Sequence, residues 1–217
     1  MIEAKVRARL GQFQLDAELQ SSGIICLAGR NGSGKTSFLR AIAGFLQVDE
    51  GYVKIGGTDV TRLPVEKRGV VMVTPTSFFP HLDVDSHIVW GAGLRGTKLE
   101  KEEVSKVKSE LGIDFGGSVR NLSQGMRERV ALATALLASP RVILVDEAFS
   151  SIHERKEFTV SYGRLVTEKD IDLVFTSQDE TDGRLSDHLY VMDNGSMSHK
   201  CQSEDNAGES TAQHSRE

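Results

Sequence analysis

This sequence of 217 residues has only two cysteines and no excess of positive charge. Each of these absences excludes some classes of protein. Of the two cysteines, Cys26 lies in the apolar run GIICLAG, so we expect a buried thiol in a reducing compartment and no disulfide with the distant Cys201. The 26 Lys and Arg residues stand against 31 Asp and Glu, which gives a net charge of −5. That balance argues against a general nucleic-acid binder, so we expect no nucleic-acid partner.

Long apolar runs are also missing. The first ten residues, MIEAKVRARL, lack the apolar core of a signal peptide, and no later run reaches the roughly 20 residues of a membrane span. We therefore expect a cytoplasmic protein, which leaves open docking on a membrane component. The hydrophobic fraction of 39% is ordinary for a globular domain with a real core.

The periodicity of the chain predicts an α/β fold. Residues 2–20 alternate in polarity, which predicts two antiparallel strands with a turn near Gly11, and residues 51–64 read as strand, turn and strand. Apolar strands are predicted at 23–29 and 68–75. The near-continuous apolar runs at 141–147 and 172–177 are typical of strands in a parallel sheet that is covered on both faces, and HLYVMD predicts a last strand that turns at Asn194. Apolar residues at helical spacing predict a first helix after residue 34, with Phe38, Ile42, Phe45 and Leu46 on one side and Gly44 inside it. The same spacing predicts helices near 99–113, after Ser123, and at 154–170.

The segment GRNGSGKT, residues 29–36, has the spacing G-x-x-x-x-G-K-[ST] between an apolar strand and a helix. Backbone N–H groups of such a loop converge on one phosphate, and the helix start adds the positive end of its dipole. Lys35 is predicted to reach the β- and γ-phosphates, and the Thr36 hydroxyl to bind magnesium. The predicted phosphate-binding residues are Gly29, Arg30, Asn31, Gly32, Ser33, Gly34, Lys35, Thr36 and Ser37.

The strand RVILVDE places two acids at its carboxyl end, where open α/β sheets bind ligands. Asp146 is predicted to hold Mg²⁺, directly or through water. Glu147 is predicted to act as the general base that polarises the attacking water.

The segment NLSQGMRERVALATALLASPRVILVDE resembles the signature region of ATP-binding cassette (ABC) proteins. The resemblance covers residues 1 to about 197 and implies a P-loop NTPase core with a mostly parallel sheet, an N-terminal antiparallel β subdomain and an inserted α-helical signature lobe at about 83–139. It implies that Ser123 and Gly125 reach the γ-phosphate of ATP held by the other subunit of a homodimer or heterodimer. Residues 198–217 contain almost no apolar side chains and are expected to form a disordered tail.

The strands at 6–19 and the segment RLPVEKRGV look most like the ATPase subunits of molybdate and tungstate importers, although sulfate, polyamine and sugar importers share most of these features. This resemblance implies a subunit that hydrolyses ATP with Mg²⁺ on the inner face of the cell membrane and that drives a transmembrane permease. His81, in the segment FFPHLDV, is expected near the permease.

Four positions depart from the pattern of the family. Thr74 stands where the family has a Gln that touches magnesium and the attacking water, and Ser177 stands where it has a switch His. Gln124 replaces the first signature Gly, and His153 replaces an Asp. Thr74 and Ser177 are kept as catalytic candidates, but the four changes raise an alternative: a weak or inactive regulatory subunit that dimerises on ATP. Glu147 argues against an inactive site.

The family stacks adenine on an aromatic side chain near the amino terminus. Phe13 is the aromatic residue available there, while Leu10 is the other position that aligns. A role for Phe13 in the strand core stays equally open.

Overall fold

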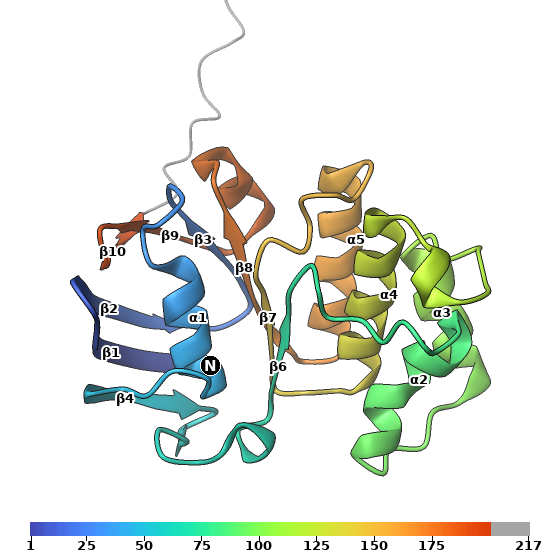
Figure 1. Cartoon of the computed structure of the whole chain (residues 1–217), viewed down its shortest axis with the longest axis horizontal. Coiled ribbons are helices and arrows are strands. Elements are labelled where there is room, and N and C mark those ends of the chain that lie inside the picture. Colours follow the sequence, from blue (N-terminus) through green and yellow to red (C-terminus); the bar gives the residue numbers. More distant parts are fainter. Residues whose placement is uncertain (201–217) are drawn as a thin grey trace, which may run out of the picture.

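A computed structural model describes residues 1–200, and its strands form one ten-stranded sheet in the order β5-β4-β1-β2-β10-β9-β3-β8-β7-β6 (Figure 1). Residues 201–217, which include Cys201 and most of the predicted tail, lie outside the described residues. The strands β3, β6, β7, β8 and β9 are joined by parallel pairing, which confirms the prediction made for the apolar runs at 141–147 (β7) and 172–177 (β8). They span Ile24–Ala28, Val70–Val73, Val142–Val145, Asp172–Ser177 and His188–Asp193.

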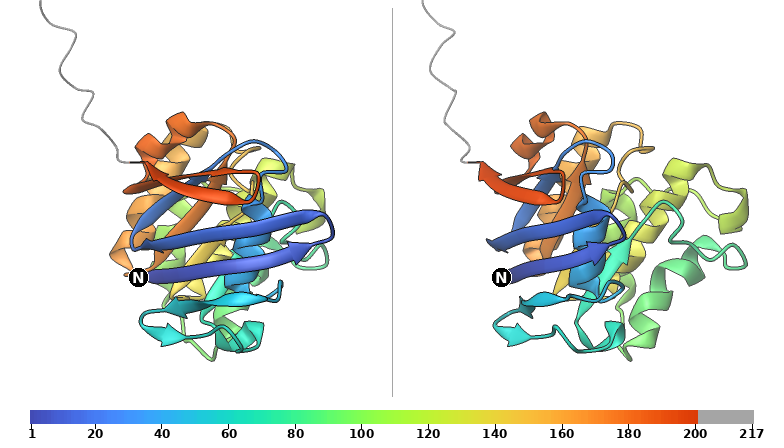
Figure 2. Two further views of the ribbon diagram at one scale, coloured as in Figure 1. Left: turned by 90° about the vertical axis from the view of Figure 1, so that its left-hand side faces the viewer. Right: turned by 60° about the vertical axis from the view of Figure 1, so that its left-hand side comes forward.

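The other strands pair antiparallel, except for one parallel contact between β10 and β2, and their long first hairpin faces the viewer in Figure 2. The hairpin turns at Gly11, as predicted, and its second strand meets the parallel part of the sheet through β10. The strands are β1 (Ile2–Leu10), β2 (Phe13–Ser21), β4 (Glu50–Ile55), β5 (Thr58–Asp59) and β10 (Ser196–Lys200).

The sheet has a separate apolar core on each face. Successive residues of β7 alternate between the faces, so Leu144 joins the core around α1 (Lys35–Ala43), while Val145 joins the core around α4 (Gln124–Leu137) and α5 (Arg155–Glu168). Figure 1 shows α1 on one side of the central strands and α4 and α5 on the other. Both faces are covered, which explains why β7 is apolar throughout.

The chain between β6 and β7 carries the helices α2 (Val84–Leu94), α3 (Lys101–Glu110) and α4. The charged spacing predicted α3, but α2 was not predicted. It begins at Asp83, whose carboxylate accepts a hydrogen bond from the Ser86 N–H at 2.8 Å. Three short 3₁₀ helices, η1 (Val65–Lys67), η2 (Val119–Asn121) and η3 (Glu180–Leu185), complete the described elements.

The expectations for the first helix and for the tail need correction. Gly44 does not lie inside α1: it ends the helix with a φ of 92°, a left-handed conformation that glycine adopts without strain. Phe45 therefore does not share the buried face of Phe38 and is 63% exposed. Residues 198–200 pair with β9 as the end of β10, so the chain remains structured beyond the predicted boundary at 197.

Candidate nucleotide site

The loop 29–34 connects β3 to α1 at the carboxyl end of the parallel strands. Its glycines are required by geometry, because a Cβ on Gly29 would lie 2.3 Å from the Met192 carbonyl oxygen. Gly34, with a φ of 112°, starts α1 and leaves room for Phe13. The loop is held to the turn after β9, because the Ser33 carbonyl oxygen accepts from the Gly195 N–H at 2.8 Å. A glycine-rich loop at the start of a helix suits an anion.

The Lys35 side chain folds back over this loop. It is 5% exposed, and its ammonium group donates to the carbonyl oxygens of Gly29 at 2.6 Å and Arg30 at 2.9 Å. Burial lowers the pKa of Lys35, while the charges of Glu147 and Asp146 oppose that shift. The two hydrogen bonds hold the Lys35 ammonium group against the loop.

The environment of the Ser33 hydroxyl shows whether the loop fits a phosphate. Its side-chain oxygen is buried and has no hydrogen-bonding partner in residues 1–200. A buried hydroxyl without a partner is unfavourable, and a phosphate oxygen in the loop would satisfy it. The donor groups of the loop therefore fit a nucleotide phosphate.

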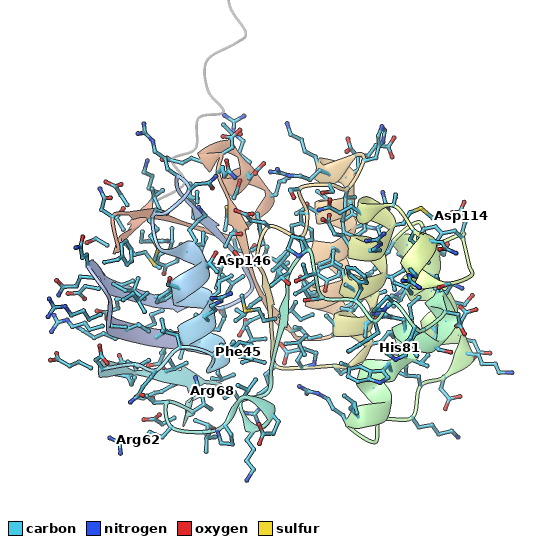
Figure 3. All side chains as sticks on the ribbon, in the orientation of Figure 1. Phe45, Arg62, Arg68, His81, Asp114 and Asp146 are labelled. Atoms are coloured by element: carbon cyan, nitrogen blue, oxygen red, sulfur yellow. The ribbon has the colours of Figure 1, made fainter. Side chains whose placement is uncertain are left out.

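The two predicted magnesium ligands lie together. The Thr36 hydroxyl donates to Asp146 Oδ1 at 3.1 Å, and the same oxygen accepts from Thr176 at 3.3 Å (Figure 3 labels Asp146 beside α1). A hydroxyl and a carboxylate are hard oxygen ligands of the kind that Mg²⁺ binds together with phosphate and water. Within residues 1–200 no cluster of three or more His, Cys, Asp or Glu side chains could hold a metal ion.

Glu147 is held in an unusual backbone conformation, with a φ of 60°. Its N–H donates to the Thr176 hydroxyl at 2.9 Å, which fixes the turn that follows β7. Left-handed conformations of non-glycine residues are uncommon and concentrate at functional sites. The carboxylate is exposed and lines both cavities of the site.

Two cavities meet at Lys35 and Glu147, because both side chains line each of them. One, of about 270 Å³, contains Leu10, Phe13 and the residues of the loop. The other, of about 330 Å³, contains Ser177, Thr176 and Arg155. A nucleotide whose phosphates lie in the loop would thus have its base in the first cavity and its γ-phosphate at the junction.

Phe13 and Leu10 are register partners at the end of the first hairpin. Both line the cavity of the loop, so the geometry leaves either side chain available to adenine. The Phe13 ring is half-buried, and its tip would lie 3.0 Å from a Cβ placed on Gly34.

Ser177 lies in the second cavity, but its hydroxyl is already engaged. It donates to the Asp182 carboxylate and accepts from the Asp179 N–H at 3.0 Å. Ser177 is 7% exposed and Asp182 is 4% exposed. The structure therefore gives the Ser177 hydroxyl proton a carboxylate partner inside the protein.

Thr74 follows β6 and lines neither cavity. Its hydroxyl lies 3.1 Å from the hydroxyls of both Thr76 and Ser77, and its N–H donates to Ser77. These contacts fold the 74–77 segment on itself. The catalytic role of Thr74 stays a prediction.

Ser123 and Gly125 also line neither of the two cavities. Ser123 begins α4 and accepts a hydrogen bond from the Met126 N–H at 3.3 Å. Gly125 packs against the loop after Glu147, where a Cβ would lie 2.5 Å from the Ser151 carbonyl oxygen. The Gln124 side-chain amide donates to Glu128 at 3.1 Å, and Glu128 also accepts from the Ser151 N–H at 3.2 Å.

Sequence reasoning missed three residues of the second cavity region: Thr176, Arg155 and Asp182. Thr176 is the penultimate residue of an apolar strand next to β7, which is a signal that could have been used. Arg155 and Asp182 come from the start of α5 and from η3, and their ion pair gives no sequence signal.

The fold and this site define a P-loop nucleotide-binding domain. The structure of an ATP-binding subunit of an ABC transporter superposes with a TM-score of 0.76, at 18% identity, over 92% of this chain and 90% of that chain. A family model described as ABC transporter matches residues 13–150. The chain belongs to the ABC transporter family.

Curated relatives include import ATP-binding proteins. This chain is 37% identical over 207 residues to a molybdate/tungstate import ATP-binding protein of Archaeoglobus fulgidus, covering 90% of the chain and 85% of that relative. It is 36% identical over 194 residues to a protein provisionally named for 2-aminoethylphosphonate import in Salmonella typhimurium, covering 84% of the chain. The chain spans about half the length (52%) of that Salmonella relative. No helix within residues 1–200 is long and apolar enough to cross a membrane.

Proposed function

We propose that this chain is the ATP-hydrolysing subunit of an ABC importer and that it works on the inner face of a cell membrane. The observation that carries the proposal is the meeting of Lys35, Thr36, Asp146 and Glu147 at one end of the sheet, where two cavities join. Phosphoryl transfer depends mainly on positioning and charge neutralisation, and this group of side chains is suited to both.

Each residue has a separate task in this proposal. The loop and Lys35 bind the phosphates, and Ser33 donates its unpartnered hydroxyl. Thr36 and Asp146 would hold Mg²⁺, directly or through water, and the ion would neutralise charge on the β- and γ-phosphates. Glu147 is placed to take a proton from a water that attacks the γ-phosphate.

The proposed active unit is a dimer, with an identical or a different ABC subunit as partner. Ser123 and Gly125 lie on the helical lobe and outside both cavities of their own chain, so they are free to meet a nucleotide held by another chain. The N-terminus of α4 would then add its dipole to the γ-phosphate. ATP would hold two chains together, and hydrolysis would release them.

The proposed membrane partner is a permease. A mainly apolar groove of about 500 Å³ runs between β6, the segment after Thr74, and the helices α2 and α4. Trp90 and Leu94 lie beside it and are 40% and 68% exposed. His81 lies on this lobe side in Figure 3, near α2. An exposed apolar groove of this kind suits a protein partner.

The proposed solute is an oxyanion such as molybdate or tungstate. Support comes from the names of the relatives, which specify molybdate and tungstate or a phosphonate. The alternative of a regulatory subunit that binds ATP without turnover draws no support from these relatives. Glu147, lining the junction of the two cavities, also favours hydrolysis.

The test begins with calorimetric binding of ATP and Mg²⁺ to the full chain. We expect Lys35→Ala to weaken ATP and ADP binding at least tenfold, because it removes the cation buried under the loop. Lys98→Ala, a change of an exposed lobe lysine, is the control and should bind as the parent does. Equal ATP affinity in the parent and Lys35→Ala would refute the proposed site.

Glu147→Gln should abolish turnover and leave ATP binding intact, because the amide cannot accept the proton of the attacking water. With turnover blocked, ATP should hold a dimer that elutes earlier in size-exclusion chromatography. A Glu147→Gln variant that still hydrolyses ATP at the parent's rate would contradict the role of Glu147.

A further inference from the structure

Ser177, Asp182 and Arg155 form a hydrogen-bonded network beside the second cavity. The Asp182 carboxylate accepts from the Ser177 hydroxyl and from the Arg155 guanidinium, and the Ser177 hydroxyl accepts from the Asp179 N–H. Asp182 is 4% exposed, so its charge would be very unfavourable without the nearby cation. The three side chains come from β8, η3 and the start of α5.

Arg155 also faces the reacting end of the site. Its side chain lines the cavity that contains Lys35, Glu147 and Thr176. Lys35 and Arg155 are the two basic residues that line this cavity among the described residues. The γ-phosphate is expected at the junction with the loop cavity, so Arg155 lines a cavity that would contain this phosphate.

The Arg155 guanidinium has N–H donors that Asp182 does not use. A guanidinium carries five N–H donors in a planar fork. Within residues 1–200 its hydrogen-bonding partner is Asp182, through one terminal nitrogen, and the side chain is 37% exposed. One edge is anchored by a buried carboxylate while the remaining donors are available to a phosphate.

We propose that Arg155 contacts the γ-phosphate of ATP and stabilises the charge that develops on it during hydrolysis, with Asp182 and Ser177 as positioning residues. This inference rests on the proposed function, since it assigns a further residue to the same site. The Ser177 hydroxyl donates its hydrogen bond to Asp182, so its proton is not available to the phosphate, whereas the arginine that pairs with Asp182 carries a positive charge and further N–H donors. A cation fixed at the transferred phosphoryl group is an effective stabiliser in phosphoryl transfer.

The contact also predicts discrimination between nucleotides. ADP has no γ-phosphate, so Arg155 should contribute to ATP affinity and leave ADP affinity almost unchanged. Lys35, which reaches the loop itself, should affect both nucleotides. The ratio of ATP to ADP affinity therefore separates a γ-phosphate contact from a general structural role.

The experiment measures ATP and ADP affinities by calorimetry, and single-turnover hydrolysis, for the 217-residue chain with Mg²⁺. Arg155→Gln keeps a donor for Asp182 but removes the charge, and Arg155→Lys keeps the charge but loses the fork. For Arg155→Gln we expect about a tenfold loss of ATP affinity, less than a twofold change for ADP, and about a 100-fold slower hydrolysis. Arg155→Lys should recover part of both losses.

Arg164→Ala is the matched control, because Arg164 is an exposed arginine of the same helix and lines neither cavity. It should match the parent in affinity ratio and rate. Folded Arg155→Gln and Arg155→Lys proteins, verified by thermal melting, that keep the parent's ratio and rate would overturn the inference.

The same measurements separate this inference from the proposed function. If the parent binds no ATP, or Lys35→Ala binds both nucleotides normally, the proposed function fails and the inference fails with it. If Lys35→Ala loses both nucleotides while the Arg155 variants behave as Arg164→Ala does, the inference alone is wrong.

Discussion

The Thr36 hydroxyl lies 3.1 Å from Asp146 Oδ1, although 110 residues separate the two positions in the chain. The contact joins the start of α1 to the end of β7. It brings together the two side chains that were separately predicted as magnesium ligands, and it suggests a direct test of that prediction.

Thr36→Val keeps the shape of the side chain and removes its oxygen. We expect ATP affinity in the presence of Mg²⁺ to fall at least tenfold, toward the value measured with a chelator, because one oxygen ligand and the partner of Asp146 are lost. Thr167→Val, a change on α5, should keep the parent's magnesium dependence. A Thr36→Val protein whose affinity rises with Mg²⁺ as the parent's does would show that Thr36 is no ligand.

Phe13→Ala and Leu10→Ala decide which side chain supports adenine. Stacking on an aromatic ring contributes about 1–3 kcal/mol per base, so if Phe13 is the platform, Phe13→Ala should weaken ATP binding about tenfold and Leu10→Ala much less. The measurement is calorimetry with ATP and with inorganic triphosphate, whose affinity should not change. An ATP loss confined to Leu10→Ala would assign the contact to Leu10.

Gly125→Ala should destabilise the fold by about 1–3 kcal/mol, because the new Cβ would lie 2.5 Å from the Ser151 carbonyl oxygen. Gly93→Ala on α2 is the matched control: its Cβ meets nothing within 4 Å, and alanine favours a helix. In urea unfolding, the free energy of unfolding should therefore fall for Gly125→Ala and rise for Gly93→Ala, relative to the parent. Equal stability of parent and Gly125→Ala would mean that this loop moves aside freely.

Arg68 lies at the C-terminal end of α1 and binds its last carbonyl oxygens (Figure 3 labels it below the helix). Its guanidinium donates to the carbonyl oxygens of Ala41 and Ile42 in α1 and to those of Leu63 and Thr61. Arg68→Met should lower stability by about 2–4 kcal/mol, because buried carbonyl groups lose their donors.

Arg68→Lys should recover only part of that stability, because an ammonium group cannot reach all four oxygens at once. Urea unfolding of both variants gives the comparison. Full stability of the lysine variant would show that charge alone, and not the fork, is required.

His87 makes stability depend on pH. It is 1% exposed, its Nε2 accepts from the Phe79 N–H at 3.1 Å, and its Nδ1 lies 2.8 Å from the Thr134 hydroxyl. Burial lowers the pKa of His87 below its unfolded value of about 6.5, so below that pH the unfolded chain binds a proton that the folded chain does not.

The contribution of His87 is therefore complete above pH 6.5 and declines as the pH falls toward the lower folded pKa, by at most about 1.4 kcal/mol per pH unit. Urea unfolding between pH 7.5 and pH 5.5 measures this decline. The parent should lose more stability than His87→Gln over that range. Identical pH profiles would show that His87 titrates alike in both states.

Much of the site was predictable because its parts are local. The phosphate loop is one contiguous segment whose glycine spacing fixes its own backbone, and Asp146 ends an apolar strand that can only be buried. The apolar runs likewise predicted the central strands of the sheet. Gly44 was misplaced because helical periodicity continues past it, and α2 was missed because its start depends on the single cap of Asp83.

The sequence by itself determined the phosphate loop, the acidic strand end and the strands of the core, since each follows from the residue types of one short segment. Only the tertiary structure decided which side chains meet: Thr36 with Asp146, Ser177 with Asp182, and Asp182 with Arg155. Those pairs depend on the order of strands in the sheet, where β8 lies between β3 and β7, and on where α5 and η3 pack against it. Periodicity records which face of an element is buried, but the identity of the neighbour on that face is set by long-range packing.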